Sequence, residues 1–104
     1  MDWSSYSPEV QLYIREVEEK RKRTGILDYD TCQNLLEYAA EVNSDGLFGM
    51  GYYYFAEIYW QQKQYERTMH CLTECTKYFR SAEMYEFLAK TYNLMGAVSD
   101  GQNN

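Results

Sequence analysis

The residues best suited to chemistry are one histidine and three cysteines. His70 and Cys71 are adjacent, Cys75 follows one helical turn later, and Cys32 lies far upstream. A structural zinc site usually needs four such ligands, and only Cys32 and acidic residues could complete the set here. Neighbouring helical residues point about 100° apart, so His70 is poorly placed to act as a base for Cys71. We therefore predict no metal, no cofactor and no catalytic residue, and we expect that the chain is not an enzyme.

Two further stretches could in principle hold a charged ligand. Gly46, Gly49 and Gly51 are spaced somewhat like a phosphate loop, but no Lys-Ser/Thr pair follows them and no strand precedes them. We interpret these glycines as a closely packed first turn of a helix. The run EEKRKR at 18–23 could bind an acidic surface, and its simpler interpretation is a solvated helix end with Glu–Lys pairs.

Composition limits the classes of function. The chain has 104 residues, which suits one domain, and its net charge of −6 would repel a phosphate backbone. No apolar run approaches the length of a membrane span, so no membrane partner is expected. The start, MDWSSYSPEV, lacks the features of a signal peptide. Three cysteines without disulfide-scaffold spacing favour a reducing compartment, and we predict a cytoplasmic protein.

Helical spacing predicts five helices and no strand. Ser7-Pro8-Glu9 begins the first helix, at 8–23, and Asp28 or Asp30 can cap the second. The third and fourth helices are predicted at about 46–62 and 64–78. The fifth begins near Ser81 and fades near residue 100. The apolar stripe of the second helix is Cys32, Leu35, Leu36, Ala39 and Val42, and that of the fifth is Met84, Leu88, Tyr92 and Met95.

The third predicted helix is apolar on two sides. One side carries Phe48, Tyr52, Phe55, Ala56 and Tyr59, and the other carries Met50, Tyr53, Glu57, Trp60 and Gln61. A helix of this kind packs against neighbours on both sides, whereas the helix at 64–78 has a single apolar face. Inner and outer helices that alternate through short turns form an array of antiparallel helical hairpins.

The best-defined part of this array resembles a tetratricopeptide repeat, a helix–turn–helix unit of about 34 residues. The positions that carry the resemblance are Tyr52, Phe55, Ala56, Tyr59, Tyr65, Thr68, Leu72 and Cys75. Thr68 and Cys75 replace alanines of the family pattern, and Arg80 replaces its closing proline. The resemblance implies an all-α, right-handed solenoid with a degenerate repeat at 8–43, the best repeat at 46–79 and a partial repeat at 81–100. Leu88, Ala89, Tyr92 and Gly96, 33 residues after the matching positions of the best unit, give one register of the partial repeat. The string Tyr92-Asn93-Leu94-Met95-Gly96, with Gly96 as the small residue, gives a second register, which we favour.

The resemblance implies a module for protein–protein interaction. In this family the first helix of a repeat lines a groove that holds peptides. Met50, Tyr53, Glu57, Trp60 and Gln61 would form such a groove here, for an extended or helical peptide carrying a cation. The alternative is that these rings only pack on the first or fifth helix. The Lys–Asn–Arg clamp of chaperone adaptors is absent, because Tyr53 and Glu57 occupy two of its positions.

The array ends within a half-built repeat, so we expect a fragment of a longer chain. Similar tyrosine-rich arrays with a YNL-x-G string occur at the N-termini of bacterial signalling proteins, and a regulatory or scaffolding role follows from that similarity. The partner would be another protein or a domain of the same full-length chain. Self-association through the fifth helix would cover its unused apolar side. The rival interpretation is a small-ligand sensor that uses the tyrosine-rich inner face.

Overall fold

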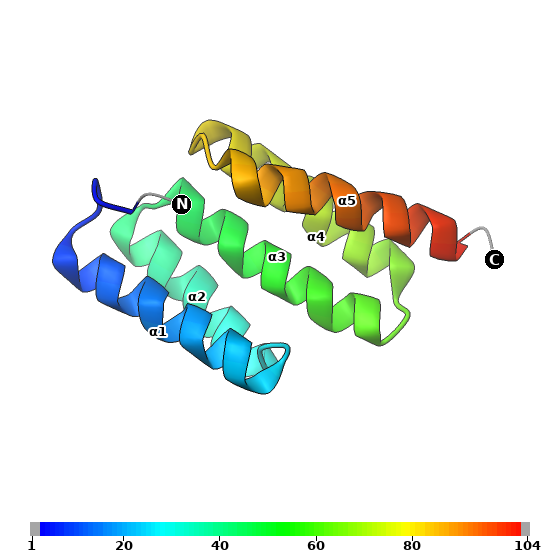
Figure 1. The fold of residues 1–104 in the computed structure, drawn as a ribbon, viewed down its shortest axis with the longest axis horizontal. Coiled ribbons are helices and arrows are strands. Elements are labelled where there is room, and N and C mark those ends of the chain that lie inside the picture. The colour runs from blue at the N-terminus through cyan, green and yellow to red at the C-terminus, as the bar shows by residue number, and fades with distance from the viewer. Residues whose placement is uncertain (1–2, 103–104) are drawn as a thin grey trace.

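A computed structural model describes residues 3–102, which form five helices and no strand (Figure 1). The helices are α1 (Pro8–Thr24), α2 (Tyr29–Val42), α3 (Asp45–Gln61), α4 (Tyr65–Ser81) and α5 (Tyr85–Gln102). The prediction of an all-α fold is confirmed. The fifth helix begins at Tyr85 rather than near Ser81, because α4 continues to Ser81.

Consecutive helices run antiparallel and form two layers. Figure 1 shows α1, α3 and α5 in front, with α2 and α4 behind them. The central helix α3 packs against both α2 and α4, and α4 also packs against α5. The predicted inner position of α3 is therefore confirmed, whereas α1 and α5 lie at opposite edges of the array.

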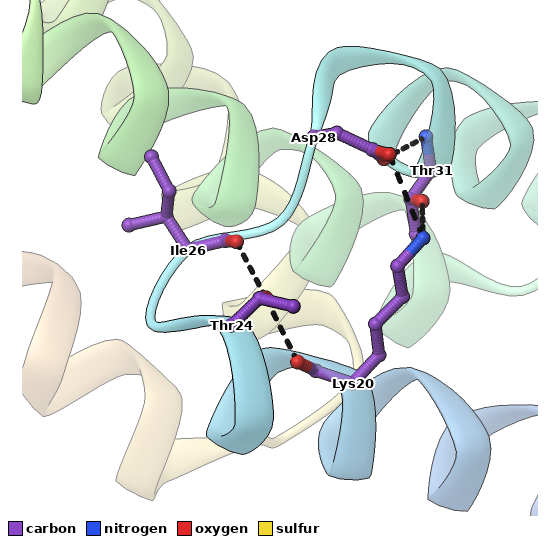
Figure 2. A network of polar contacts seen from close by, with 5 residues as sticks. All are labelled: Lys20, Thr24, Ile26, Asp28 and Thr31. Atoms are coloured by element: carbon purple, nitrogen blue, oxygen red, sulfur yellow. Dashed lines mark hydrogen bonds and ion pairs between the residues drawn. The ribbon is translucent and has the colours of Figure 1, made fainter.

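Polar side chains fix the starts of three helices. Ser7, Asp28 and Ser44 each accept a hydrogen bond from the backbone N–H three residues later, which satisfies one of the free donors at a helix N-terminus. Figure 2 shows how the cap at Asp28 is joined to α1. Lys20 Nζ donates to Thr31 Oγ1 at 2.5 Å and lies 3.6 Å from the Asp28 carboxylate. This network ties the C-terminal part of α1 to the start of α2.

Three turns between helices share one geometry. Asn43, Lys63 and Glu83 each have a left-handed backbone conformation, with φ of 55°, 59° and 57°. In each turn the next N–H bonds to a carbonyl five residues back, at 2.9 to 3.0 Å, as in the Schellman motif that ends many helices. The three residues lie 20 positions apart, so two consecutive helices with their turns span about 40 residues between Asn43 and Glu83. A tetratricopeptide unit spans about 34 residues.

The first half of α3 is built for close packing. A Cβ added at Gly49 would lie 2.6 Å from two ring atoms of Phe79 on α4, and one added at Gly51 would lie 2.4 Å from Leu36 on α2. Ala56 is fully buried further along the same helix. Small residues on two sides of α3 thus admit a neighbour from each side.

The face of α5 that enters the core differs from the predicted one. Phe87, Thr91 and Val98 are buried, whereas Tyr92 of the predicted stripe is 46% exposed. Thr91 donates to the Phe87 carbonyl, which satisfies its hydroxyl inside the core. Of the predicted stripe, Met84 is buried and Leu88 and Met95 pack half-buried against the core, so the prediction was wrong at Tyr92. The reason is that α4 contacts α5 through Phe87, which stacks on Phe79, and through Thr91, which lies next to Cys75.

Candidate functional site

A groove on the front layer is lined by three helices that are not consecutive in sequence. Its volume is about 310 Å³, and it is open to solvent. The lining side chains come from the end of α1, the middle of α3 and the start of α5: Glu18, Arg21, Lys22, Tyr53, Tyr54, Glu57, Glu86, Phe87 and Lys90. The groove lies where the three helices α1, α3 and α5 of one layer meet (Figure 1).

An ion pair closes the groove between α1 and α3. Arg21 Nε and Nη2 donate to the two carboxylate oxygens of Glu57 at 2.8 and 2.7 Å. The side chains are only 33% and 16% exposed, so solvent screens the pair less than it would on an open surface. The hydrogen bond to Glu57 raises the pKa of Arg21. Both carboxylate oxygens of Glu57 already accept hydrogen bonds from Arg21. Glu57 is therefore less available to bind a cation on a peptide, which is the role that the sequence analysis expected for it.

Aromatic rings form the wall between α3 and α5. The Tyr53 ring centroid lies 5.8 Å from that of Phe87 in an edge-to-face contact, and Phe87 stacks on Phe79 at 4.9 Å. Lys90 Nζ lies 5.3 Å from the Phe87 ring centroid. Burial, followed by the charge of Glu57, raises the pKa of Tyr53. The Tyr53 hydroxyl therefore stays protonated at neutral pH and can donate a hydrogen bond to a ligand.

Only two of the five residues predicted for the groove line it. Tyr53 and Glu57 line it. Met50 is fully buried and does not line the groove. Trp60 lies near the other end of α3, with its ring 5.7 Å from that of Tyr65 and next to Gly101. Gln61 is exposed at the end of the helix.

Sequence reasoning missed the groove residues on the two edge helices. Arg21 was assigned to a solvated helix end, and Phe87 and Lys90 lie outside the predicted stripe of the fifth helix. For Arg21 the only sequence signal was its positive charge near a helix end, which could pair with Glu57, the single carboxylate on an otherwise aromatic face of the third helix. The distance of 36 residues between Arg21 and Glu57 hid that pairing.

The thiols are free, buried and separate from the groove. Cys32, Cys71 and Cys75 are all buried, and desolvation raises their pKa values to about 12, 11 and 12. The described residues contain no group of three or more side chains placed to hold a metal ion. His70 is exposed beside a second, shallow hollow with Tyr59, Arg67 and Cys71.

Comparisons with family models, curated proteins and solved structures give no match for this chain. Among the helices of residues 3–102, none combines the length and the apolar character that a bilayer crossing requires.

Proposed function

We propose that this chain is a tetratricopeptide-like helical-repeat module that binds a peptide segment of a partner protein. The observation that carries the proposal is the open groove in which α1, α3 and α5 meet. A groove bordered by aromatic rings and rimmed by charges of both signs suits a segment with an apolar anchor residue.

The geometry of the array supports the repeat part of the proposal. Three equivalent left-handed turns at Asn43, Lys63 and Glu83 connect helices of similar length. A solenoid built from such hairpins presents its alternate helices on one surface. The span of about 40 residues for two helices is longer than the family's unit of about 34, so the family's residue pattern transfers to the repeat at 46–79 better than to α5.

The side chains that line the groove limit the kind of peptide segment that it can bind. Glu57 is engaged by Arg21, so a cation on the peptide finds no unpaired carboxylate at the centre. Tyr53 and Phe87 offer apolar surface there, while Lys90 and Glu18 stand among the rim residues. We infer a segment with a central apolar or aromatic side chain. We also propose that the chain is a regulatory or scaffolding part of a larger bacterial signalling protein and that this protein is cytoplasmic.

A small-ligand sensor is the second candidate, and the shape of the groove favours it less. Ligand pockets of about 300–1,000 Å³ usually bury most of the ligand surface. The volume here, about 310 Å³, is at the lower end of that range, and the groove is open. A peptide that crosses the groove needs no enclosure.

Two adjacent tyrosines provide a matched test. Tyr53 faces the groove, while Tyr52 is also half-buried but stacks on Tyr78 of α4. Peptides selected from a displayed library on the 104-residue chain would be titrated by fluorescence anisotropy against Tyr53→Ala and Tyr52→Ala. We expect Tyr53→Ala to weaken binding at least about tenfold and Tyr52→Ala to change it less than about threefold. Equal effects of the two substitutions would contradict binding in this groove.

A further inference from the structure

The segment that precedes α1 crosses the front layer and packs there. We call residues 3–7 the strap, and Figure 1 shows it passing from the start of α1 towards the first turn of α3. A turn folds the strap back on itself, because the Tyr6 N–H donates to the Trp3 carbonyl at 3.0 Å. The two rings lie 5.2 Å apart between centroids, and both are half-buried against the core. These two aromatic side chains therefore attach the strap to the front layer.

Tyr6 lies where α3 and α5 begin. A Cβ added at Gly46, in the first turn of α3, would lie 2.7 Å from both the Tyr6 hydroxyl oxygen and Met84 Sδ. The Trp3 ring would be 3.7 Å away. Met84 is buried and directly precedes α5. The space left by the missing side chain of Gly46 is thus filled jointly by the strap and by the start of α5.

The strap is also attached to α1. Gln11 Nε2 donates to the Tyr6 carbonyl at 2.7 Å. Trp3 lines a hollow of about 270 Å³ together with Gln11 and Ile14 of α1. It lines a second hollow, of about 320 Å³, together with Met84 and the first residues of α5. The strap therefore reaches from α1 on one side to the start of α5 on the other.

The two edge helices have few other means of keeping their distance. The close helix pairs are α2–α3, α3–α4 and α4–α5. Helix α1 is joined to α2 by the ring contact of Tyr13 with Tyr38, and to α3 by the ion pair of Arg21 with Glu57. Helix α5 is joined to α4 and α3 through Phe87. The strap adds a connection between α1 and the start of α5.

The strap borders the groove that the two edge helices form with α3. The hollow between Trp3 and α1 shares Glu18 and Lys22 with the groove. On the other side of the strap, Glu86 lines both the second hollow and the groove. Trp3 itself does not line the groove. A change at Trp3 can therefore move the walls of the groove without altering the surface that a peptide would touch.

We propose that Trp3 and Tyr6 are positioning residues of the groove. They hold the start of α1 and the start of α5 to the first turn of α3, and so set the distance between the two outer walls. The Arg21–Glu57 ion pair holds the other end of α1 against α3. A site whose walls are already in place loses less free energy to ordering when a ligand binds. The expected effect on peptide affinity rests on the proposed function, whereas the effect on the distance between the walls does not.

A distance measurement tests the proposal without any peptide. Spin labels would be attached at Lys22→Cys and Lys90→Cys, which line the groove from opposite walls, while the three native thiols are buried. Pulsed electron paramagnetic resonance would compare the labelled chain with its Trp3→Ala and Trp60→Ala variants. Trp60, the other tryptophan, is also half-buried but lies beside Tyr65 and away from the strap. We expect the distance distribution to broaden about twofold in Trp3→Ala and to stay unchanged in Trp60→Ala.

Two milder variants separate positioning from a general loss of structure. Trp3→Phe keeps a ring on the front layer and should restore the narrow distribution. Gln11→Ala removes only the hydrogen bond to the Tyr6 carbonyl and should broaden the distribution less than Trp3→Ala does. It also provides the test if Trp3→Ala fails to fold. An unchanged distribution in both Trp3→Ala and Gln11→Ala would overturn the proposal.

Peptide affinity of the unlabelled chain is the second readout. Trp3→Ala should weaken binding of the selected peptides at least about fivefold, and Trp3→Phe should change it less than about twofold. Tighter binding by Trp3→Ala would overturn the proposal, because the strap would then compete with the peptide for the groove. A broadened distribution in a chain that binds no peptide would support the positioning of the walls and contradict the proposed function.

Discussion

Replacement of two helical glycines by alanine should change stability in opposite directions. At Gly49 the new Cβ would lie 2.6 Å from two Phe79 ring atoms, whereas carbon atoms in contact are normally about 3.5–4.0 Å apart. The ring would have to move by roughly 1 Å. Phe79 is fully buried and stacked on Phe87, so it has little room to do so.

The size of the effect follows from two opposing terms. Overpacking of a well-packed core costs about 1–3 kcal/mol, and contact with two atoms of a rigid ring favours the upper end. Alanine has a higher helix propensity than glycine, which stabilises the variant by about 1 kcal/mol. We therefore expect Gly49→Ala to lose about 2 kcal/mol of unfolding free energy. Gly96→Ala meets open space and should gain about 1 kcal/mol from the same propensity term.

Urea denaturation followed by circular dichroism measures both variants against wild type. The protein should be kept at a few micromolar, so that self-association does not contribute. A loss of about 2 kcal/mol would lower the melting temperature by roughly 10 °C in a domain of this size. If Gly49→Ala were as stable as wild type while Gly96→Ala gained stability, the close packing of α3 on Phe79 would be refuted.

Three further substitutions or conditions test the packing and the charges. Ala56→Leu should lose about 1–3 kcal/mol, because Ala56 is fully buried beside its neighbours; an unchanged urea midpoint would argue against that packing. Glu57→Gln should lose about 1–2 kcal/mol by leaving Arg21 half-buried without its partner, whereas Glu74→Gln, at the more exposed pair with Lys77, should lose at most about 0.5 kcal/mol. The raised thiol pKa values favour the neutral form in the fold, so their stabilisation is complete below about pH 9 and declines as pH rises towards 11–12. Melting temperatures between pH 8 and 10.5 should fall, and Cys75→Ala should fall less steeply than wild type.

Local sequence signals predicted the helices and their starts well. Ser7 caps α1 and Asp28 caps α2, because a cap depends only on residues within one turn of it. The double-sided character of α3 and the buried state of Ala56 also follow from local spacing. These features need no knowledge of distant parts of the chain.

The face of α5 and the composition of the groove could not be predicted in this way. Tyr92 and Thr91 are neighbours in sequence, and only the position of α4 decides that Thr91 enters the core. Arg21 reaches Glu57 because the 40-residue hairpin places α1 beside α3. A spacing taken from a 34-residue repeat does not reveal such a contact.

The two-layer arrangement also affects how the chain folds and fluctuates. Most packing joins helices that are adjacent in sequence, and contacts of this kind favour rapid folding. The α3–α4 hairpin lies in the middle and is packed on both sides, so its amides should exchange with solvent most slowly. The helices α1 and α5, at the edges, should open first. They carry two of the three walls of the groove, so a bound peptide would slow amide exchange most at the ends of the array, far from its most rigid centre.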